Sequence, residues 1–320
     1  MSMDEGLPAT IPFLPRCFLS HEKGYLVIGM DGEFLRLDEQ YRALEEAATP
    51  FPMRVSHAVH AGDYLFATWI DGELMLARMG SMNLNNAPQT GPKRAELRTA
   101  NEHASKYHPK GNRWSHVLNA EPLALAVSKS ALVFNLWKRG LYALDHDAKE
   151  LWRQQVPQWN YAKRRPRNEE ILAIHIHDEE LTITSRGGRA QRRSLSTGEL
   201  LEEYILNGPE GPLEHHFRHE NHDLICSTQG ELCWLKDNTV VQRIQLNGPV
   251  QGAVWDPYIS GWRLAGWREE VIISHQRTEQ HAWNEIPVHV QPVKGGAMVL
   301  FNNGTWLNSH FESHVAQEEE

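Results

Sequence analysis

The sequence predicts an all-β protein, a seven-bladed β-propeller of four-stranded antiparallel blades. The first observation is an internal repeat: the segment Tyr204–Pro209 returns forty residues later as Ile244–Pro249, and both copies end in Leu-Asn-Gly-Pro. The second observation is that four short apolar runs, separated by turn residues, lie between the two copies. Short runs rich in Leu, Ile, Val, Cys and Trp are typical of strands rather than of helices. A period near forty residues with four strands in each period is typical of one propeller blade.

The second strand of this unit serves as an anchor for following the repeat along the whole chain. The anchors are Leu26, Leu65, Leu132, Leu181, Leu224, Leu264 and Met298. Successive anchors are separated by 39, 67, 49, 43, 40 and 34 residues, so five of the six intervals are close to one blade. The interval of 67 residues indicates an insertion between blades two and three. We therefore expect a single β-propeller domain over residues 1–320, in which residues 80–120 form an inserted excursion.

Turn residues support the hairpin between the second and third strands of most blades. They are Asp31-Gly32, Asp71-Gly72, Arg139-Gly140, Gly187-Gly188, Gln229-Gly230 and Asn303-Gly304, in blades one to five and in blade seven. Glycine, asparagine and aspartate adopt the positive φ angles that such turns need. Blade six lacks a hairpin glycine and is recognised by its apolar runs, Val250–Trp255 and Trp262–Trp267. After the turn at Asp71-Gly72, the third strand of blade two is expected at Glu73–Ala77.

Only short helices are expected. The best candidate outside the insertion is Gln40–Ala48, and a second short helix is expected around Arg94–Tyr107 within it. The insertion should also contain the outer strand of blade two. Loops of this length inside a compact domain are usually functional or disordered.

The end of the chain shows no clear outer strand for blade seven. Ile11–Leu14, near the N-terminus, is a candidate to take that place and close the ring. Closure has a physical reason, because an unpaired edge strand invites edge-to-edge association with another molecule.

Two stretches resemble a known repeat. Gly140-Leu-Tyr-Ala-Leu-Asp145, followed after a turn by Leu151-Trp152, resembles the repeat of the quinoprotein-like and WD40-like β-propeller superfamily. Weaker versions occur at Asp31–Asp38 and Ser194–Leu201. The resemblance implies the propeller architecture alone. The quinone-dependent members of that superfamily have eight blades and a pair of adjacent cysteines above the cofactor, and this chain has no adjacent cysteines.

Composition sets the broad class of the protein. The chain is 41% hydrophobic and 23% charged, values that are ordinary for a globular protein. No apolar run approaches the length of a membrane span, and the acidic start Met1–Glu5 does not look like a secretory signal. Three cysteines do not make a disulfide framework, and Cys226 and Cys233 are expected to stay reduced. We therefore expect a cytoplasmic protein that does not bind a membrane.

Charge is distributed unevenly along the chain. Residues 86–200 contain 19 Lys or Arg and 12 Asp or Glu, whereas the remainder contains 13 and 29. In an antiparallel blade, the turns between strands two and three share one face with the connections between blades. The basic sector expected on this face consists of Lys138, Arg139, Lys163, Arg164, Arg165, Arg167, Arg186 and Arg189. The same face of blades one and two should be acidic, with Asp31, Glu33, Asp71 and Glu73.

Three interpretations of the basic sector stay open. It can be an ordinary solvated surface, a binding site for an acidic protein partner, or a nucleic-acid surface. Nucleic acid is the less favoured partner because the net charge is −9 and binding to a phosphate backbone requires a strong positive stripe. Trp159 and Tyr161 precede the basic run and are suited to anchoring a protein interface or stacking on a base.

Histidine, with 18 copies, is the main candidate metal ligand. Histidines expected on or beside the innermost strands are His57, His175, His215, His216 and His289. A channel lined by imidazoles could hold a divalent metal and support a hydrolase or lyase. The alternative is that these side chains hydrate the channel and cap turns. Neither a helical His-x-x-x-His nor a Cys-x-x-Cys motif supports a metal, so no metal or cofactor is predicted.

Other catalytic signatures are missing from the sequence. There is no Gly-x-Ser-x-Gly elbow, no comparable Ser, His and Asp arrangement and no glycine-rich phosphate loop. Of the eleven tryptophans, Trp69, Trp137 and Trp267 end second strands and are expected to pack between blades. The resulting hypothesis is a non-catalytic scaffold for protein–protein interaction, one subunit of a larger intracellular assembly, with no enzyme activity.

Overall fold

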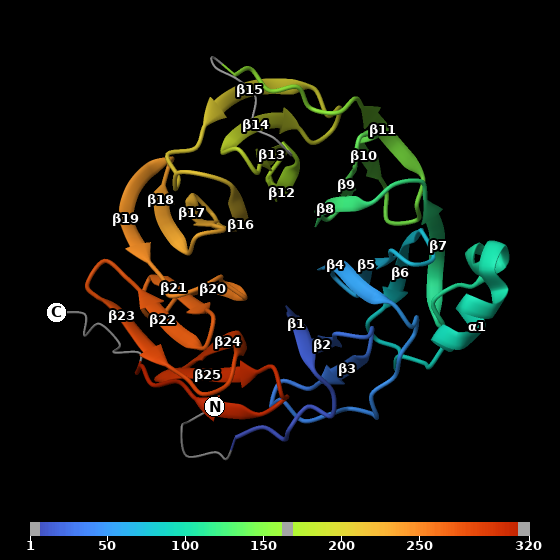
Figure 1. Ribbon diagram of the computed structural model, residues 1–320, viewed down its shortest axis with the longest axis horizontal. Coiled ribbons are helices and arrows are strands. Elements are labelled where there is room, and N and C mark those ends of the chain that lie inside the picture. The colour runs from blue at the N-terminus through green and yellow to red at the C-terminus, as the bar shows by residue number, and fades with distance from the viewer. Residues whose placement is uncertain (1–6, 162–168, 313–320) are drawn as a thin grey trace.

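The computed structural model describes residues 7–161 and 169–312. Seven antiparallel sheets are arranged radially around a central axis, and each sheet is one blade (Figure 1). Blades two to six have four strands, and blades one and seven have three. This architecture confirms the seven-bladed all-β propeller that the repeat predicted. In every blade the strands follow one another in chain order, with the first strand nearest the axis.

The strands of the first three blades are as follows. Blade one contains β1 (Pro15–His21), β2 (Gly24–Gly29) and β3 (Phe34–Leu37). Blade two contains β4 (Arg54–Ala61), β5 (Tyr64–Asp71), β6 (Leu76–Asn83) and β7 (Asn112–Leu118). Blade three contains β8 (Pro122–Val127), β9 (Leu132–Leu136), β10 (Gly140–Leu144) and β11 (Glu150–Gln154).

The remaining four blades complete the ring. Blade four contains β12 (Ile171–His177), β13 (Glu180–Ser185), β14 (Arg189–Ser194) and β15 (Leu200–Ile205). Blade five contains β16 (Leu213–His219), β17 (His222–Ser227), β18 (Glu231–Lys236) and β19 (Thr239–Gln245). Blade six contains β20 (Gly252–Asp256), β21 (Gly261–Ala265), β22 (Glu269–Ile273) and β23 (Thr278–Ala282). Blade seven contains β24 (Pro287–Val293), β25 (Gly296–Phe301) and β26 (Trp306–Asn308).

Burial between neighbouring blades explains why many of the middle strands are continuous apolar runs. Each blade is covered on both faces, so alternation between polar and apolar residues is lost. In β18 the residues Leu232–Leu235 are all buried, whereas the outer strand β19 of the same blade has no buried residue. The buried apolar side chains of the described residues form seven clusters, one at each junction between blades. These junctions are the hydrophobic core of the molecule.

The junction between blades seven and one closes the ring. Val27 and Leu35 of blade one pack there against Leu300 and Trp306 of blade seven, together with Ile11 from the N-terminal segment. The Ile11 amide donates a hydrogen bond to the Gly304 carbonyl at 2.9 Å. Gly304 has a φ of 83°, and a Cβ at this position would come within 2.2 Å of the Ile11 oxygen. The expected segment Ile11–Leu14 therefore reaches blade seven, but it does not form a fourth strand there.

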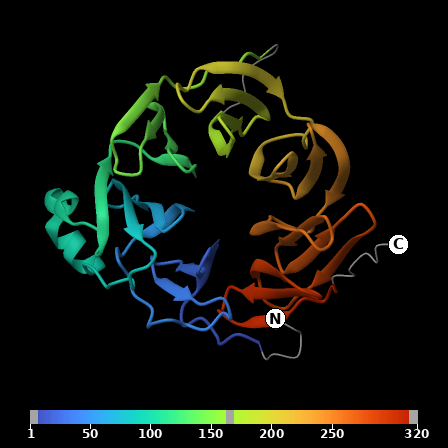
Figure 2. The same cartoon turned by 180° about the vertical axis from the view of Figure 1, so that it is seen from behind.

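The insertion contains the expected helix and outer strand. Helix α1 (Arg94–Ala100) and the 3₁₀ helix η1 (Asn101–Lys106) lie on the outer rim beside blade two (Figures 1 and 2). Leu97 and Ala104 are buried in the cluster between blades one and two, which fixes the helix against the ring. β7 then completes blade two.

Two local expectations were wrong. Gln40–Ala48 is not a helix: it runs beside β3 and makes isolated bridges from Ala43 to Leu37 and from Ala48 to Phe34. This segment takes the place of an outer strand because its backbone pairs with β3 and Tyr41 packs against Trp306. The third strand of blade two starts at Leu76 rather than at Glu73. Its hairpin turn is longer than expected, and Met75, in the left-handed region, is the last residue before β6.

The three cysteines are free thiols. Cys226 and Cys233 lie on paired strands, but Cys226 belongs to the cluster between blades five and six and Cys233 to the cluster between blades four and five. Their side chains therefore point to opposite faces of blade five. Within residues 7–161 and 169–312, no helix is both long and apolar enough to cross a lipid bilayer.

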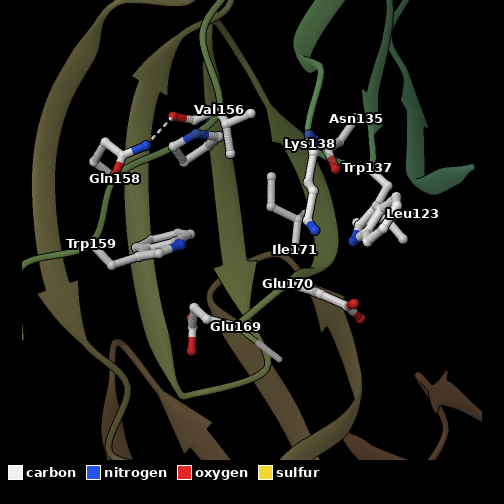
Figure 3. A pocket seen from close by; sticks show the side chains of 11 residues that line it. Leu123, Asn135, Trp137, Lys138, Val156, Gln158, Trp159, Glu169, Glu170 and Ile171 are labelled. Carbon is white, nitrogen blue, oxygen red and sulfur yellow. Dashed lines mark hydrogen bonds between the residues drawn. The ribbon is translucent and has the colours of Figure 1, made fainter. Parts of the chain in front are cut away.

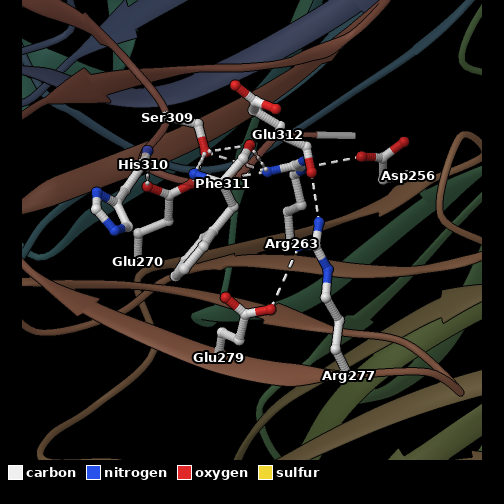
Figure 4. A network of polar contacts seen from close by, with 9 residues as sticks. All are labelled: Asp256, Arg263, Glu270, Arg277, Glu279, Ser309, His310, Phe311 and Glu312. Atoms are coloured by element: carbon white, nitrogen blue, oxygen red, sulfur yellow. Dashed lines mark hydrogen bonds and ion pairs between the residues drawn. The ribbon is translucent and has the colours of Figure 1, made fainter. Parts of the chain in front are cut away.

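A buried ionic network joins the last described residues to blade six (Figure 4). The guanidinium of Arg263 lies 2.6 Å from the Asp256 carboxylate and 3.7 Å from that of Glu270, and all three residues are fully buried. Arg263 also donates to the Ser309 hydroxyl at 3.1 Å and to the Phe311 carbonyl at 3.3 Å. Buried charges are tolerated only when paired, so this network holds Ser309–Phe311 against blade six.

Replacement of Arg263 by methionine should therefore destabilise the protein strongly. Asp256 and Glu270 would stay buried without their guanidinium partner, and the free energy of unfolding should fall by about 3–5 kcal/mol in urea titrations. Arg153→Met is the control, because Arg153 and Glu150 form an exposed pair at 2.7 Å. The control should leave the free energy of unfolding almost unchanged, because exposed ion pairs contribute little to stability. Equal losses in the two variants would contradict the structural role of the network.

Candidate functional site

The candidate site is the surface that loops of blades three and four form on one face of the ring. The β9–β10 hairpin contributes Trp137, Lys138 and Arg139, which are all exposed. The connection from β11 to β12 contributes Trp159 and Tyr161, and the β13–β14 hairpin with the start of β14 contributes Arg186 and Arg189. Lys163, Arg164, Arg165 and Arg167 lie outside the described residues. We refer to the surface of the seven described residues as the blade three–four face.

Two of its cations stack on aromatic rings. The Lys138 ammonium lies 4.2 Å from the centre of the Trp137 ring, and the Arg189 guanidinium lies 4.9 Å from that of Tyr161. In the described part of the chain, no carboxylate lies within ion-pair distance of Lys138, Arg139 or Arg189. Arg186 differs, because it lies 3.7 Å from Glu170. Three positive charges on this face therefore lack an acidic partner within the described protein.

The exposure of two tryptophans corrects a sequence expectation. Trp69 is fully buried between blades one and two, as expected. Trp137 is 43% exposed and Trp267 is 48% exposed, so neither is buried between blades. Both residues come after the last residue of a second strand, β9 or β21, and so belong to the turn rather than to the sheet.

A cleft of about 550 Å³ opens between blades three and four on this face (Figure 3). Trp137 and Lys138 line one side and Trp159 the other, while Glu169 and Glu170 lie below them in the view of Figure 3. The segment that carries Trp159 is fixed to blade four. Gln191 donates to the Gln158 carbonyl at 2.8 Å, and the Asn160 amide donates to the Glu203 carboxylate at 2.9 Å.

Glu169 is unusual among the residues of the cleft. Both of its carboxylate oxygens are buried beside the Tyr161 hydroxyl, and none of these three oxygens makes a hydrogen bond of ordinary geometry with a described residue. Burial, and after it the neighbouring Glu169 carboxylate, raises the pKa of Tyr161. A Cβ on Gly187 would come within 2.3 Å of Glu169 Oε2. Gly187 is therefore required for the position of this carboxylate, whose charge has a large desolvation cost unless it is compensated.

The acidic part of this face is partly neutralised by the insertion. Arg94 of α1 lies 3.1 Å from the buried Asp71 carboxylate, and Arg98 lies 2.5 Å from that of Glu73. Asp31 makes no ion pair with any described residue and lines a second cleft, of about 650 Å³, between blades one and two. The expected contrast between a basic and an acidic sector is thus reduced on the acidic side.

The histidines of the inner strands connect neighbouring blades. His57 Nε2 lies 3.1 Å from the Pro122 carbonyl of blade three, and His175 Nε2 lies 3.1 Å from the His216 carbonyl of blade five. Burial lowers the pKa of His175 to about 3, with the nearby His216 acting in the same direction, and burial lowers that of His289 to about 4. These imidazoles are therefore neutral near pH 7. Within the described residues, no three His, Cys, Asp or Glu side chains converge as metal ligands would.

A hydroxyl–imidazole–carboxylate chain, which was not predicted from the sequence, links blades four and five. Thr184 Oγ1 lies 2.8 Å from His216 Nδ1, and His216 Nε2 lies 2.8 Å from Asp223 Oδ1. Such a chain resembles the hydrogen-bonding order of a nucleophilic triad. Thr184, however, is fully buried, and the chain crosses the junction between blades four and five. A substrate cannot reach a hydroxyl in this position, so the chain serves to hold two blades together.

Comparisons with known proteins identify the architecture. No family model matches the sequence, and no curated protein is similar to it. Among solved structures, the β-propeller domain of Swd1 from Myceliophteria thermophila matches with a TM-score of 0.67 and 11% identity, over 95% of this chain and 98% of that one. BamB from Moraxella catarrhalis matches with a TM-score of 0.56 and 11% identity, over 90% and 82%. The computationally designed Ika8 protein matches with a TM-score of 0.59 and 10% identity, over 94% and 97%. Likeness at this level of identity establishes the propeller fold alone.

The lowered pKa of the partly buried His175 predicts that the protein becomes less stable as the pH is lowered. An unfolded histidine binds a proton below a pH of about 6.5. His175 in the folded protein binds one only near pH 3. Its contribution to stability is therefore complete above pH 6.5 and is lost as the pH falls toward 3.

His175→Gln removes this ionisation and keeps an N–H donor. The dependence of the free energy of unfolding on pH, measured by urea titration from pH 6 to pH 4, should decrease by up to about 1.4 kcal/mol per pH unit. His177→Gln is the control, because this imidazole is 62% exposed on the same strand. An unchanged slope in His175→Gln would show that His175 is not held neutral by burial.

Proposed function

We propose that this protein is a non-catalytic β-propeller scaffold that binds an acidic protein partner through the blade three–four face. The observation that carries the proposal is the set of cations without counter-ions. Lys138, Arg139 and Arg189 have no acidic partner among the described residues, and two of them lie on the rings of Trp137 and Tyr161. Tryptophan, tyrosine and arginine are the residues that most often dominate the energy of protein interfaces.

Electrostatics and rigidity both support this assignment. A group of positive charges on an otherwise acidic protein steers an acidic partner toward one face and fixes its orientation. The loops that carry these charges are supported by blades packed on both sides, so little ordering of the backbone is needed when a partner binds. Lys163, Arg164, Arg165 and Arg167 belong to the same proposal on the basis of their place in the sequence.

The same proposal covers the domain organisation of the protein, its location and its assembly. The chain would act as a single propeller domain, in the cytoplasm, as one subunit of a larger intracellular assembly. The free thiols of Cys226 and Cys233 support a reducing compartment. The scaffold role, rather than catalysis, is supported by the inner histidines and Thr184, which are committed to bonds between and within blades. A nucleic-acid partner is the competing interpretation of the same cations.

Charge reversal tests the proposed face. The variant Lys138→Glu, Arg139→Glu, Arg189→Glu should recover at least about tenfold less of an acidic partner in affinity purification, because three attractive contacts become repulsive. The control is Lys129→Glu, Lys149→Glu, Lys236→Glu, which makes the same change of net charge at exposed positions in turns or at a strand end on the opposite face. Equal recovery with the two variants would contradict the proposal. Loss of bound RNA or DNA instead of protein would support the nucleic-acid alternative.

A further inference from the structure

The cleft between blades three and four has a chemistry opposite to that of the surface around it. Its rim carries Lys138, but its lining contains two carboxylates and two indole rings, those of Glu169, Glu170, Trp137 and Trp159 (Figure 3). Its volume of about 550 Å³ is within the range of small-ligand sites. Carboxylates and indole rings together favour a positively charged group.

A cation of the protein itself already lies in the cleft. The Lys138 ammonium is 4.2 Å from the centre of the Trp137 ring, and its side chain points into the space above Glu170 (Figure 3). Lys138 adopts a φ of 54°, which is uncommon for a residue other than glycine. A positive charge over an indole face is favourable, and it becomes more so when water is excluded.

The carboxylates of the cleft are incompletely neutralised by the described residues. Glu170 is 31% exposed and lies 3.7 Å from Arg186, without a hydrogen bond between them in the described structure. The oxygens of Glu169 are buried beside the Tyr161 hydroxyl and make no hydrogen bond of ordinary geometry within residues 7–161 and 169–312. Two negative charges at one end of a cleft, with aromatic rings on its sides, attract a cationic group and repel an anionic one.

We propose that this cleft receives one arginine or lysine side chain from the protein partner, held over Trp137 and Trp159 and paired with Glu170. This proposal rests on the proposed function, and it specifies the partner further. The partner's contact surface would be acidic, to match Lys138, Arg139 and Arg189, and would carry one basic side chain at its centre. Such a pattern discriminates between acidic partners, because a surface without the central cation leaves the carboxylates of the cleft unpaired.

The cleft also gives Lys138 a second role. Its ammonium occupies the position over Trp137 that the incoming cation would take, so the two compete. Removal of the Lys138 charge should therefore strengthen binding of a cation in the cleft, although it weakens attraction of the acidic surface around it. The effect of Lys138 removal on cation binding in the cleft is thus opposite to its effect on binding of the acidic surface, and this difference distinguishes the inference from the proposed function.

The test uses the full chain with ¹⁵N-labelled tryptophan and a small cation in place of the partner. Methylguanidinium chloride is titrated while the indole N–H signals are followed, and those of Trp137, Trp159 and Trp267 are assigned through their phenylalanine variants. The neutral isostere N-methylurea, at the same ionic strength, is the matched control ligand. Trp267 is the internal control, because it is exposed to a similar extent on the same face, in blade six, outside the cleft.

The expected result is a saturable shift of the Trp137 and Trp159 signals by methylguanidinium alone, with the Trp267 signal unchanged. Glu170→Gln should weaken the apparent affinity at least threefold, and Lys138→Ala should strengthen it. No saturable shift, an equal response to N-methylurea, or an unchanged affinity in both variants would overturn the inference. The proposed function would survive that outcome if the charge-reversal variant still lost its acidic partner, since that test does not depend on the cleft.

Discussion

Burial of each blade between its two neighbours is the constraint on which the rest of this structure depends. A single four-stranded sheet of this kind has two apolar faces, and neither can be covered within the blade. Seven sheets in a closed ring cover all of these faces, and the last junction is made by Val27 and Leu35 of blade one with Leu300 and Trp306 of blade seven. The bridged segment around Ala43–Ala48 and the N-terminal Ile11 complete the two three-stranded blades that meet there. Because these contacts hold the ring together, the loops at its two faces are free to carry other chemistry.

Several groups that resemble functional sites belong instead to this ring. His57 and His175 lie against carbonyls of the neighbouring blade, and Thr184, His216 and Asp223 form a buried chain across another junction. Arg263 holds the last described residues against blade six through buried carboxylates. Polar networks of this kind fix the register of packed sheets, since every member must find its partner. The blade three–four face differs, because Lys138, Arg139 and Arg189 make no ion pair with any described residue.

The sequence predicted the architecture because a repeat of short apolar runs constrains it strongly. Topology alone then placed Lys138, Arg139, Arg186 and Arg189 on one face, because the hairpins between the second and third strands of all blades lie on the same face of the ring. The burial of individual side chains could be predicted less well from the sequence. Trp137 and Trp267 were expected between blades because they were assigned to the ends of second strands. The strands end one or two residues earlier, at Leu136 and Ala265, and this small difference moves both tryptophans from the core into a turn. The Thr184–His216–Asp223 chain could not be found in the sequence, because its members come from two blades. The sequence shows Arg94 and Arg98 one turn apart on the expected helix. That they pair with Asp71 and Glu73 could not be predicted, because the position of the helix relative to blade two depends on the fold.

We propose that the blade three–four face, and not another part of the ring, contacts a protein partner. Site-specific photocrosslinking in cells tests it most directly, with benzoyl-phenylalanine placed at position 137 or, in a second variant, at position 267. The two positions have similar exposure, 43% and 48%, and lie on the same face in blades three and six. If the blade three–four face contacts the partner, a specific crosslinked protein should form from position 137 and none from position 267. Crosslinking from position 267 alone, or equally from both positions, would contradict it.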